Sequence, residues 1–217
     1  MFRGSEFRVK SQLPTRIRFN VVISQSRANL LDTVAQRLSV NRYAVLIGPR
    51  GSGKTSLAVE YAHRHKESYS SIFWLDARSE RTLELSFVKI AHELQMHYDD
   101  RTNQSAEPAG NTKDLQDLRD LPVGKDKIPI SEKDRKTMVL TVLNWFRCPG
   151  NKEWLLIYDD VEHSEAPFLQ EFLPAMKNIK SKRGYVLITS RSDRANPSES
   201  KRHQVEPSYG DAFLQLP

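Results

Sequence analysis

One short segment has the residue types and the spacing that bind phosphate groups. Gly48, Gly53, Lys54 and Thr55 occupy the fixed positions of the pattern G-x-x-x-x-G-K-[ST], which is typical of a phosphate-binding P-loop. Gly51 and Gly53 allow the backbone to curl and to approach a phosphate with no Cβ in the way. The N–H groups of the curl and the positive end of the following helix would then attract the anion.

Two side chains of this segment have the chemistry that a bound nucleotide requires. Lys54 is expected to reach the β- and γ-phosphates as a point charge, and Thr55 to place its hydroxyl on Mg²⁺. The side chain of Arg50 is expected to face solvent, with a phosphate contact as the alternative. The expected nucleotide-binding residues are Gly48, Pro49, Arg50, Gly51, Ser52, Gly53, Lys54, Thr55 and Ser56.

A metal-bound nucleotide also needs a carboxylate, and two acids follow an apolar run. Leu155–Tyr158 is typical of a buried strand, and Asp159 and Asp160 come directly after it. We expect Asp159 to bind Mg²⁺ through water, because Mg²⁺ keeps much of its hydration shell. We expect Asp160 to act as base or orienter of the attacking water. The alternative is that the acids cap the helix that follows.

Another apolar run ends in Thr189-Ser190-Arg191. Ligands of open α/β sheets lie beyond the carboxyl ends of the strands, so Arg191 is expected to sense the γ-phosphate; the alternative is a surface cation.

Two other patterns in the sequence suggest different sites, and the evidence for each is weaker. The string Asn151–Trp154 resembles the guanine-reading pattern N-K-x-D but lacks its aspartate, which favours adenine. His63 and His65 would face different sides of a helix, which makes them a poor metal-binding pair.

Composition limits the classes of protein that the chain can represent. It has 217 residues, a formal net charge of +6 and 38% hydrophobic residues, so part of it is expected to lie outside a packed core. Its apolar runs are far shorter than the ~20 residues that span a bilayer. The single cysteine, Cys148, fits a reducing, cytoplasmic location. Segments 1–19 and 180–203 are basic, but no reader motif accompanies them, so a nucleic-acid partner is not expected.

The elements that must position these side chains alternate along the chain. Apolar runs predict strands over 43–47, 71–76, 154–158 and 184–189, and a fifth over 203–206 with a helix beginning at 211. Apolar residues at helical spacing predict helices before and between them. The segment 97–131 is rich in Pro, Gly and polar residues and is expected to be a disordered insert.

Strands that alternate with helices favour a parallel sheet covered on both faces. We therefore expect an α/β fold, a P-loop NTPase three-layer sandwich with a five-stranded parallel sheet flanked by helices. Residues 1–27 are expected to form an N-terminal arm, and residues 28–217 the nucleotide-binding domain.

Beyond the P-loop, several segments resemble the NB-ARC class of signal-transducing (STAND) ATPases, in the form found in fungal NOD-like receptors. These segments are Ser56–Ala62, Ile72–Ala77, Trp154–Val161 and Leu187–Arg191. The resemblance covers about Val40–Leu216, apart from the insert.

This resemblance implies a switch module that binds ADP or ATP with Mg²⁺ and hydrolyses ATP slowly. It implies Lys54 and Thr55 at phosphate and metal, Asp159 at Mg²⁺, Asp160 at hydrolysis and Arg191 at the γ-phosphate. In the full-length proteins of this class, ATP permits self-association into a signalling platform, with roles in innate immunity.

The chain departs from the family at both ends. Val21–Arg27 lacks the glycine of the family's adenine-walling segment, which leaves the adenine contacts open. The family continues beyond Val205–Pro207 into helical and winged-helix subdomains, so we expect the nucleotide-binding core alone, as a fragment or a truncated product. Two alternatives are an AAA+-like ATPase that acts on a nucleic-acid or protein partner, and an interaction fragment that binds nucleotide weakly.

Overall fold

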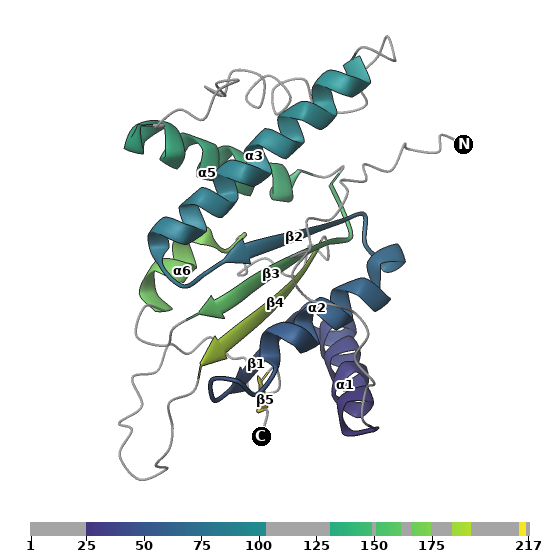
Figure 1. Ribbon diagram of the computed structural model, residues 1–217. Coiled ribbons are helices and arrows are strands. Elements are labelled where there is room, and N and C mark those ends of the chain that lie inside the picture. Colours follow the sequence, from purple (N-terminus) through teal and green to yellow (C-terminus); the bar gives the residue numbers. More distant parts are fainter. Residues whose placement is uncertain are drawn as a thin grey trace, which may run out of the picture.

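The computed structural model describes residues 25–102, 131–148, 151–161, 166–174, 184–191 and 213–215. Within these ranges five strands form one sheet: β1 (Tyr43–Gly48), β2 (Ser71–Asp76), β3 (Trp154–Val161), β4 (Gly184–Arg191) and β5 (Phe213–Gln215). Their order across the sheet is β2-β3-β4-β1-β5, and every pair is parallel. The carboxyl ends of the strands therefore meet along one edge of the sheet (Figure 1).

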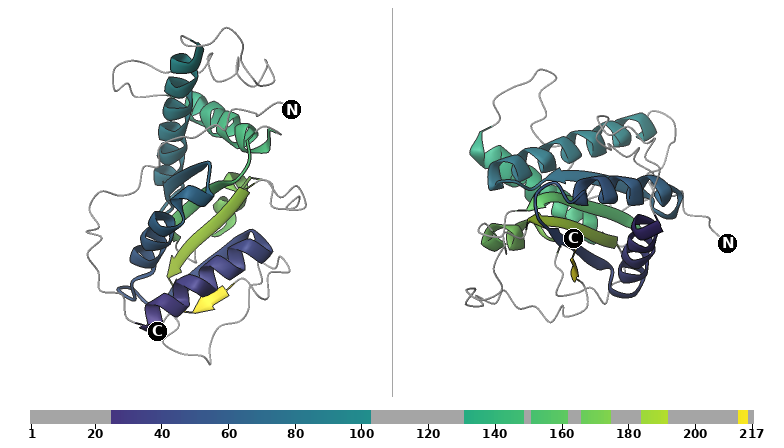
Figure 2. Two further views of the ribbon diagram at one scale, coloured as in Figure 1. Left: turned by 90° about the vertical axis from the view of Figure 1, so that its right-hand side faces the viewer. Right: turned by 60° about the horizontal axis from the view of Figure 1, so that its bottom comes forward.

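Helices cover both faces of this sheet. α1 (Gln25–Asn41) and α2 (Lys54–Arg64) pack on one face; α3 (Glu80–Thr102), α5 (Glu132–Arg147) and α6 (Ala166–Phe172) pack on the other (Figures 1 and 2). Alternate strand residues enter the two cores, as the pleat of a strand requires. In β1, Ala44 and Leu46 pack with α1 and α2, whereas Tyr43 and Val45 pack with the other helices. The expected parallel α/β sheet flanked by helices is confirmed.

The register between β3 and β4 depends on a close contact at their amino ends. Trp154 pairs with Gly184 across the two strands. A Cβ on Gly184 would lie 2.2 Å from ring atoms of Trp154, so only glycine fits beneath the indole. The pairing continues to Tyr158 and Ile188 and then shifts, so that Val161 pairs with Ser190. This bulge lies at the two acids of the expected site.

Three expectations about element bounds are wrong. The segment from residue 211 does not begin a helix: Phe213–Gln215 is a strand that pairs with Val45–Ile47 and so covers the edge of β1. α3 continues to Thr102, inside the expected insert: residues 97–102 are mostly weak helix formers, but none of them is proline or glycine, so nothing there breaks the helix. β3 and β4 also run beyond their apolar residues, through the polar side chains that follow.

Several expectations fall outside the described residues. These are the strand over 203–206, the segment 103–130 of the expected insert, and residues 1–24 of the expected arm. The last three positions of that arm, 25–27, belong to α1, which begins at Gln25. No helix in the described ranges has the length and apolar character needed to cross a membrane.

Candidate nucleotide-binding site

The glycine-rich segment forms a tight turn between β1 and α2. Gly51 and Gly53 have φ angles of 85° and 86°, a left-handed conformation that glycine adopts without steric cost. Gly53 is the N-cap of α2, and no side chain there accepts a hydrogen bond from the first turn. A helix N-terminus without such a cap presents N–H groups that an anion can satisfy.

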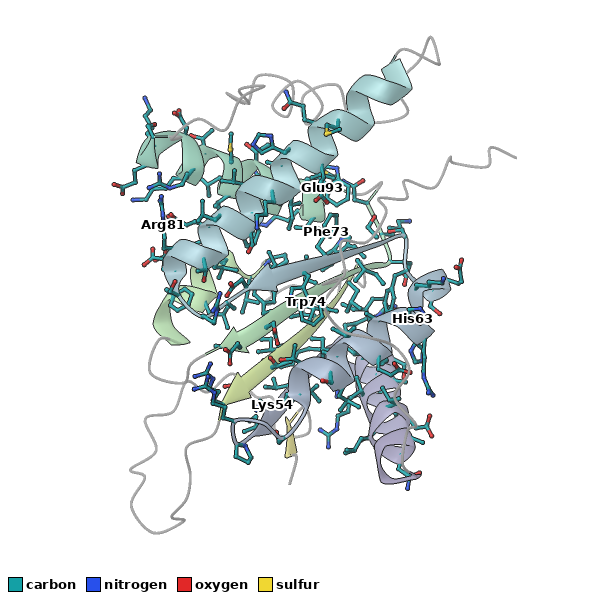
Figure 3. All side chains as sticks on the ribbon, in the orientation of Figure 1. Lys54, His63, Phe73, Trp74, Arg81 and Glu93 are labelled. Atoms are coloured by element: carbon teal, nitrogen blue, oxygen red, sulfur yellow. The ribbon has the colours of Figure 1, made fainter. Side chains whose placement is uncertain are left out.

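Lys54 lies inside this turn, at the end of the sheet where the strands finish, whereas His63 lies toward the other end of α2 (Figure 3). Its ammonium donates to the carbonyl oxygens of Gly48 and Pro49 at 2.7 Å each. The side chain of Ser52 accepts a third, longer bond at 3.4 Å. Burial lowers the pKa of Lys54, and the repulsion of Arg191 adds to this, while Asp160 and Asp159 oppose it. A bound phosphate would supply the negative charge that this buried ammonium favours.

A hydrogen bond joins the P-loop helix to the first acid of β3. The Thr55 hydroxyl donates to Oδ1 of Asp159 at 2.8 Å. The Thr189 hydroxyl on β4 donates to the same oxygen at 2.7 Å. Two residues that are 104 positions apart in the sequence therefore meet at the carboxyl edge of the sheet. Thr55 lies in the first turn of α2, which follows β1, Asp159 lies on β3, and only β4 separates β1 from β3.

The second acid occupies the bulge and is paired with the arginine of β4. Asp160 has a φ of 67°, a left-handed conformation in which Asp and Asn are enriched among residues other than glycine. Its N–H donates to the Thr189 hydroxyl at 2.8 Å. Nε of Arg191 donates to Oδ1 of Asp160 at 2.6 Å, and a terminal guanidinium nitrogen donates to Oδ2. Arg191, which is expected to contact the γ-phosphate, and Asp160, which is expected to act on the water, therefore form an ion pair with each other.

Another acid and arginine lie along the same edge, and our sequence reasoning missed them. Asp76 ends β2 and pairs in register with Asp159. Its carboxylate accepts from the guanidinium of Arg78 at 2.9 and 2.6 Å, and these hydrogen bonds lower the pKa of Asp76. The signal was available, because Asp76 follows the apolar run Ile72–Leu75 as Asp159 follows its own run.

Burial makes the ionised form of Asp159 costly in the absence of a cation. It raises the pKa of Asp159, and the nearby charges of Asp160 and Asp76 raise it further, while hydrogen bonds from Thr189 and Thr55 oppose the shift. A carboxyl with a raised pKa binds its proton more tightly in the folded than in the unfolded state. The stability of the free protein therefore falls as the pH rises from the unfolded pKa through the raised one.

Asp159→Asn is accordingly expected to stabilise the free protein at neutral pH, because it removes a buried charge and keeps the shape. The melting temperature should rise by about 2–4 °C for each kcal/mol recovered. Thermal melts of both proteins from pH 4 to pH 8 measure this, with the difference growing as the pH rises. A variant that melts lower than the parent at neutral pH would contradict it.

The residues present fit a magnesium-bound nucleotide. Thr55 and Asp159 place two hard oxygen donors in contact, and Mg²⁺ in such sites takes one or two protein oxygens, with phosphates and water as its other ligands. In the part of the chain that the structure describes, no three His, Cys, Asp or Glu side chains gather to hold a metal by themselves. His65 stacks on Tyr61 and bonds to its carbonyl oxygen, far from this edge.

The remaining expected residues lie around the same turn. Gly48 ends β1 and is buried, Pro49 and Arg50 are exposed, and Ser56 is half-buried in the first turn of α2. The two acids do not cap the next described helix, because α6 begins only at Ala166. The structure thus brings all the expected site residues to one edge of the sheet.

Comparisons with known proteins give little beyond this geometry. No family model matches the chain, and neither does any curated protein. The solved structure of C. elegans PCH-2 is similar at a TM-score of 0.39 and 13% sequence identity, over 89% of this chain and 43% of that one. The chain therefore spans less than half the length of that structure. The parallel sheet with its flanking helices is consistent with a P-loop NTPase fold.

Proposed function

We propose that this chain is an ADP/ATP-binding switch module that hydrolyses ATP slowly with Mg²⁺. The observation that carries the proposal is the 2.8 Å hydrogen bond between Thr55 and Asp159. It joins the turn suited to phosphate to the acid suited to the metal, and it does so beside a buried lysine. A glycine-rich turn without a ligand would need none of these partners.

Each residue has a separate task in this proposal. The turn and Lys54 bind the phosphates, Thr55 and Asp159 would hold Mg²⁺, and Asp160 orients or deprotonates the attacking water. Arg191 contacts the γ-phosphate and so distinguishes ATP from ADP. Mg²⁺, when bound, neutralises charge that develops on the phosphate oxygens.

The ion pair between Arg191 and Asp160 supports a slow enzyme. Arg191 donates to both carboxylate oxygens of Asp160, so its guanidinium occupies one acceptor position on each oxygen while the pair persists. A γ-phosphate offers Arg191 a competing anion, whereas ADP offers none at that position. A γ-phosphate would draw Arg191 away from this pair, and hydrolysis that follows such a rearrangement suits a switch more than an enzyme of high turnover.

Isothermal titration with Mg·ATP and Mg·ADP tests the proposal on the whole chain. We expect saturable binding of both nucleotides, weaker binding of Mg·GTP, and a rise in melting temperature with each adenine nucleotide. Mass spectrometry of the purified protein would identify any nucleotide that it retains. A folded sample that shows neither heat nor a thermal shift at millimolar nucleotide would refute the proposal.

We further propose that the module belongs to the NB-ARC class of STAND ATPases, on the resemblance of Ile72–Ala77 and Leu187–Arg191. In that case the protein would self-associate with ATP and not with ADP, as a step in cytoplasmic immune signalling. Light scattering of the protein with each nucleotide measures this. ATP turnover stimulated by DNA would instead favour the AAA+-like alternative.

A further inference from the structure

We propose that Thr189 is a positioning residue that fixes the two acids of β3 relative to each other, and that magnesium-dependent nucleotide binding requires its hydroxyl. This inference rests on the proposed function.

The Thr189 side chain is fully buried, with 0% of its surface exposed. Its Oγ1 donates to Oδ1 of Asp159 at 2.7 Å and accepts from the N–H of Asp160 at 2.8 Å. A hydroxyl can donate one hydrogen bond and accept another at the same time. An apolar side chain could form neither bond at this position, and an ammonium group could only donate. One atom therefore contacts the carboxylate of one acid and the backbone of the other.

Both contacts constrain groups that would otherwise be free to move. The bulge at Tyr158–Val161 interrupts the pairing of β3 with β4, and the N–H of Asp160 bonds to Thr189 in place of a strand carbonyl. The Asp159 carboxylate is fixed by two hydroxyls, one from the P-loop helix and one from β4. Thr189 thereby holds Asp159 toward Thr55 and keeps Asp160 in its left-handed conformation.

Thr189 and Arg191 lie on the same face of β4. Residues two apart on a strand point to the same face, so Thr189 and Arg191 approach the acids from the same side of β4. Thr189 contacts Asp159, and Arg191 contacts Asp160. The preceding residues Val186–Ile188 are apolar and buried, so packing alone would favour another β-branched apolar residue at position 189.

Thr189→Val tests this role, since valine keeps the shape and removes the hydroxyl. The affinity for ATP is measured by titration with Mg²⁺ and again with EDTA, and the ratio of the two dissociation constants reports the contribution of the metal. We expect this ratio to fall about tenfold in the variant, as for other residues that orient a metal ligand. The dissociation constant in EDTA should change less than twofold, and Thr189→Ser should restore the ratio.

Ser190→Ala is the matched control. It removes a buried hydroxyl from the same strand, but one that donates to the carbonyl oxygen of Val161 at 3.0 Å and contacts neither acid. It should leave the ratio unchanged. If Thr189→Val fails to fold, Thr189→Ala supplies the same measurement.

Two outcomes would overturn the inference. One is a folded Thr189→Val that keeps the parental ratio; the other is an equal weakening with and without Mg²⁺, which indicates a purely structural role. Failure of the proposed function looks different, because the parent protein itself would then bind no ATP.

Discussion

Lys54→Ala should weaken ATP binding by about 100-fold and ADP binding by about tenfold. Hydrogen bonds to a charged group contribute roughly 1.5–3 kcal/mol each, and tenfold in affinity corresponds to about 1.4 kcal/mol. ATP loses contacts at both the β- and γ-phosphates, whereas ADP loses only those at the β-phosphate. Titration of each nucleotide in Mg²⁺ buffer gives both values.

The folding of this variant is not expected to suffer, because burial of the ammonium already disfavours its charged form, as the lowered pKa of Lys54 indicates. Lys152→Ala is the matched control: its side chain is exposed just before β3, at the opposite edge of the sheet. It should bind both nucleotides as the parent does. Equal losses for ATP and ADP in Lys54→Ala would show that the lysine does not reach the γ-phosphate.

The residues of the site could be predicted from the sequence because their chemistry is local. The P-loop pattern needs only a strand, a turn and a helix in succession, and Lys54 and Thr55 have fixed places within it. The acids and Arg191 follow apolar runs, and parallel strands end at a common edge. Those two rules predict that residues separated by more than a hundred positions lie at the same edge of the sheet.

The partners within the site could not be predicted in the same way. The bulge in β3 gives Asp160 its φ of 67° and turns it to Arg191, and nothing in Tyr158–Val161 specifies a bulge. The two roles of the Thr189 hydroxyl depend on the strand order, which places β4 between β1 and β3. Alternation of strands and helices predicts a parallel sheet but leaves that order open.

The end of the chain shows the limit of local patterns most clearly. Asp211–Leu216 has apolar residues that fit a helix over so short a length, yet Phe213–Gln215 forms a strand. The unpaired edge of β1 determines the outcome, because it offers backbone partners that a helix would leave unused. Tertiary pairing of this kind overrides the local preference of a short segment.

Asp160→Asn should lower ATP turnover by at least about 100-fold, the usual scale for loss of a general base, and leave ATP bound. The amide cannot accept a proton from water, and it pairs less strongly with the guanidinium of Arg191 than the carboxylate does. Arg191 is then released toward the γ-phosphate, so the preference for ATP over ADP should increase. Asparagine tolerates the left-handed backbone at this position, which separates the chemical effect from misfolding.

Glu153→Gln provides a closely matched control for this substitution. Glu153 is also left-handed, with a φ of 57°, and its carboxylate pairs with Arg42 at 3.4 Å, but it lies at the amino end of β3, away from the P-loop. It should leave turnover and the ATP preference unchanged. Single-turnover hydrolysis and paired titrations of ATP and ADP measure both variants. If Asp160→Asn hydrolyses ATP at the parental rate, another group activates the water; if its preference for ATP decreases, the ion pair does not compete with the γ-phosphate.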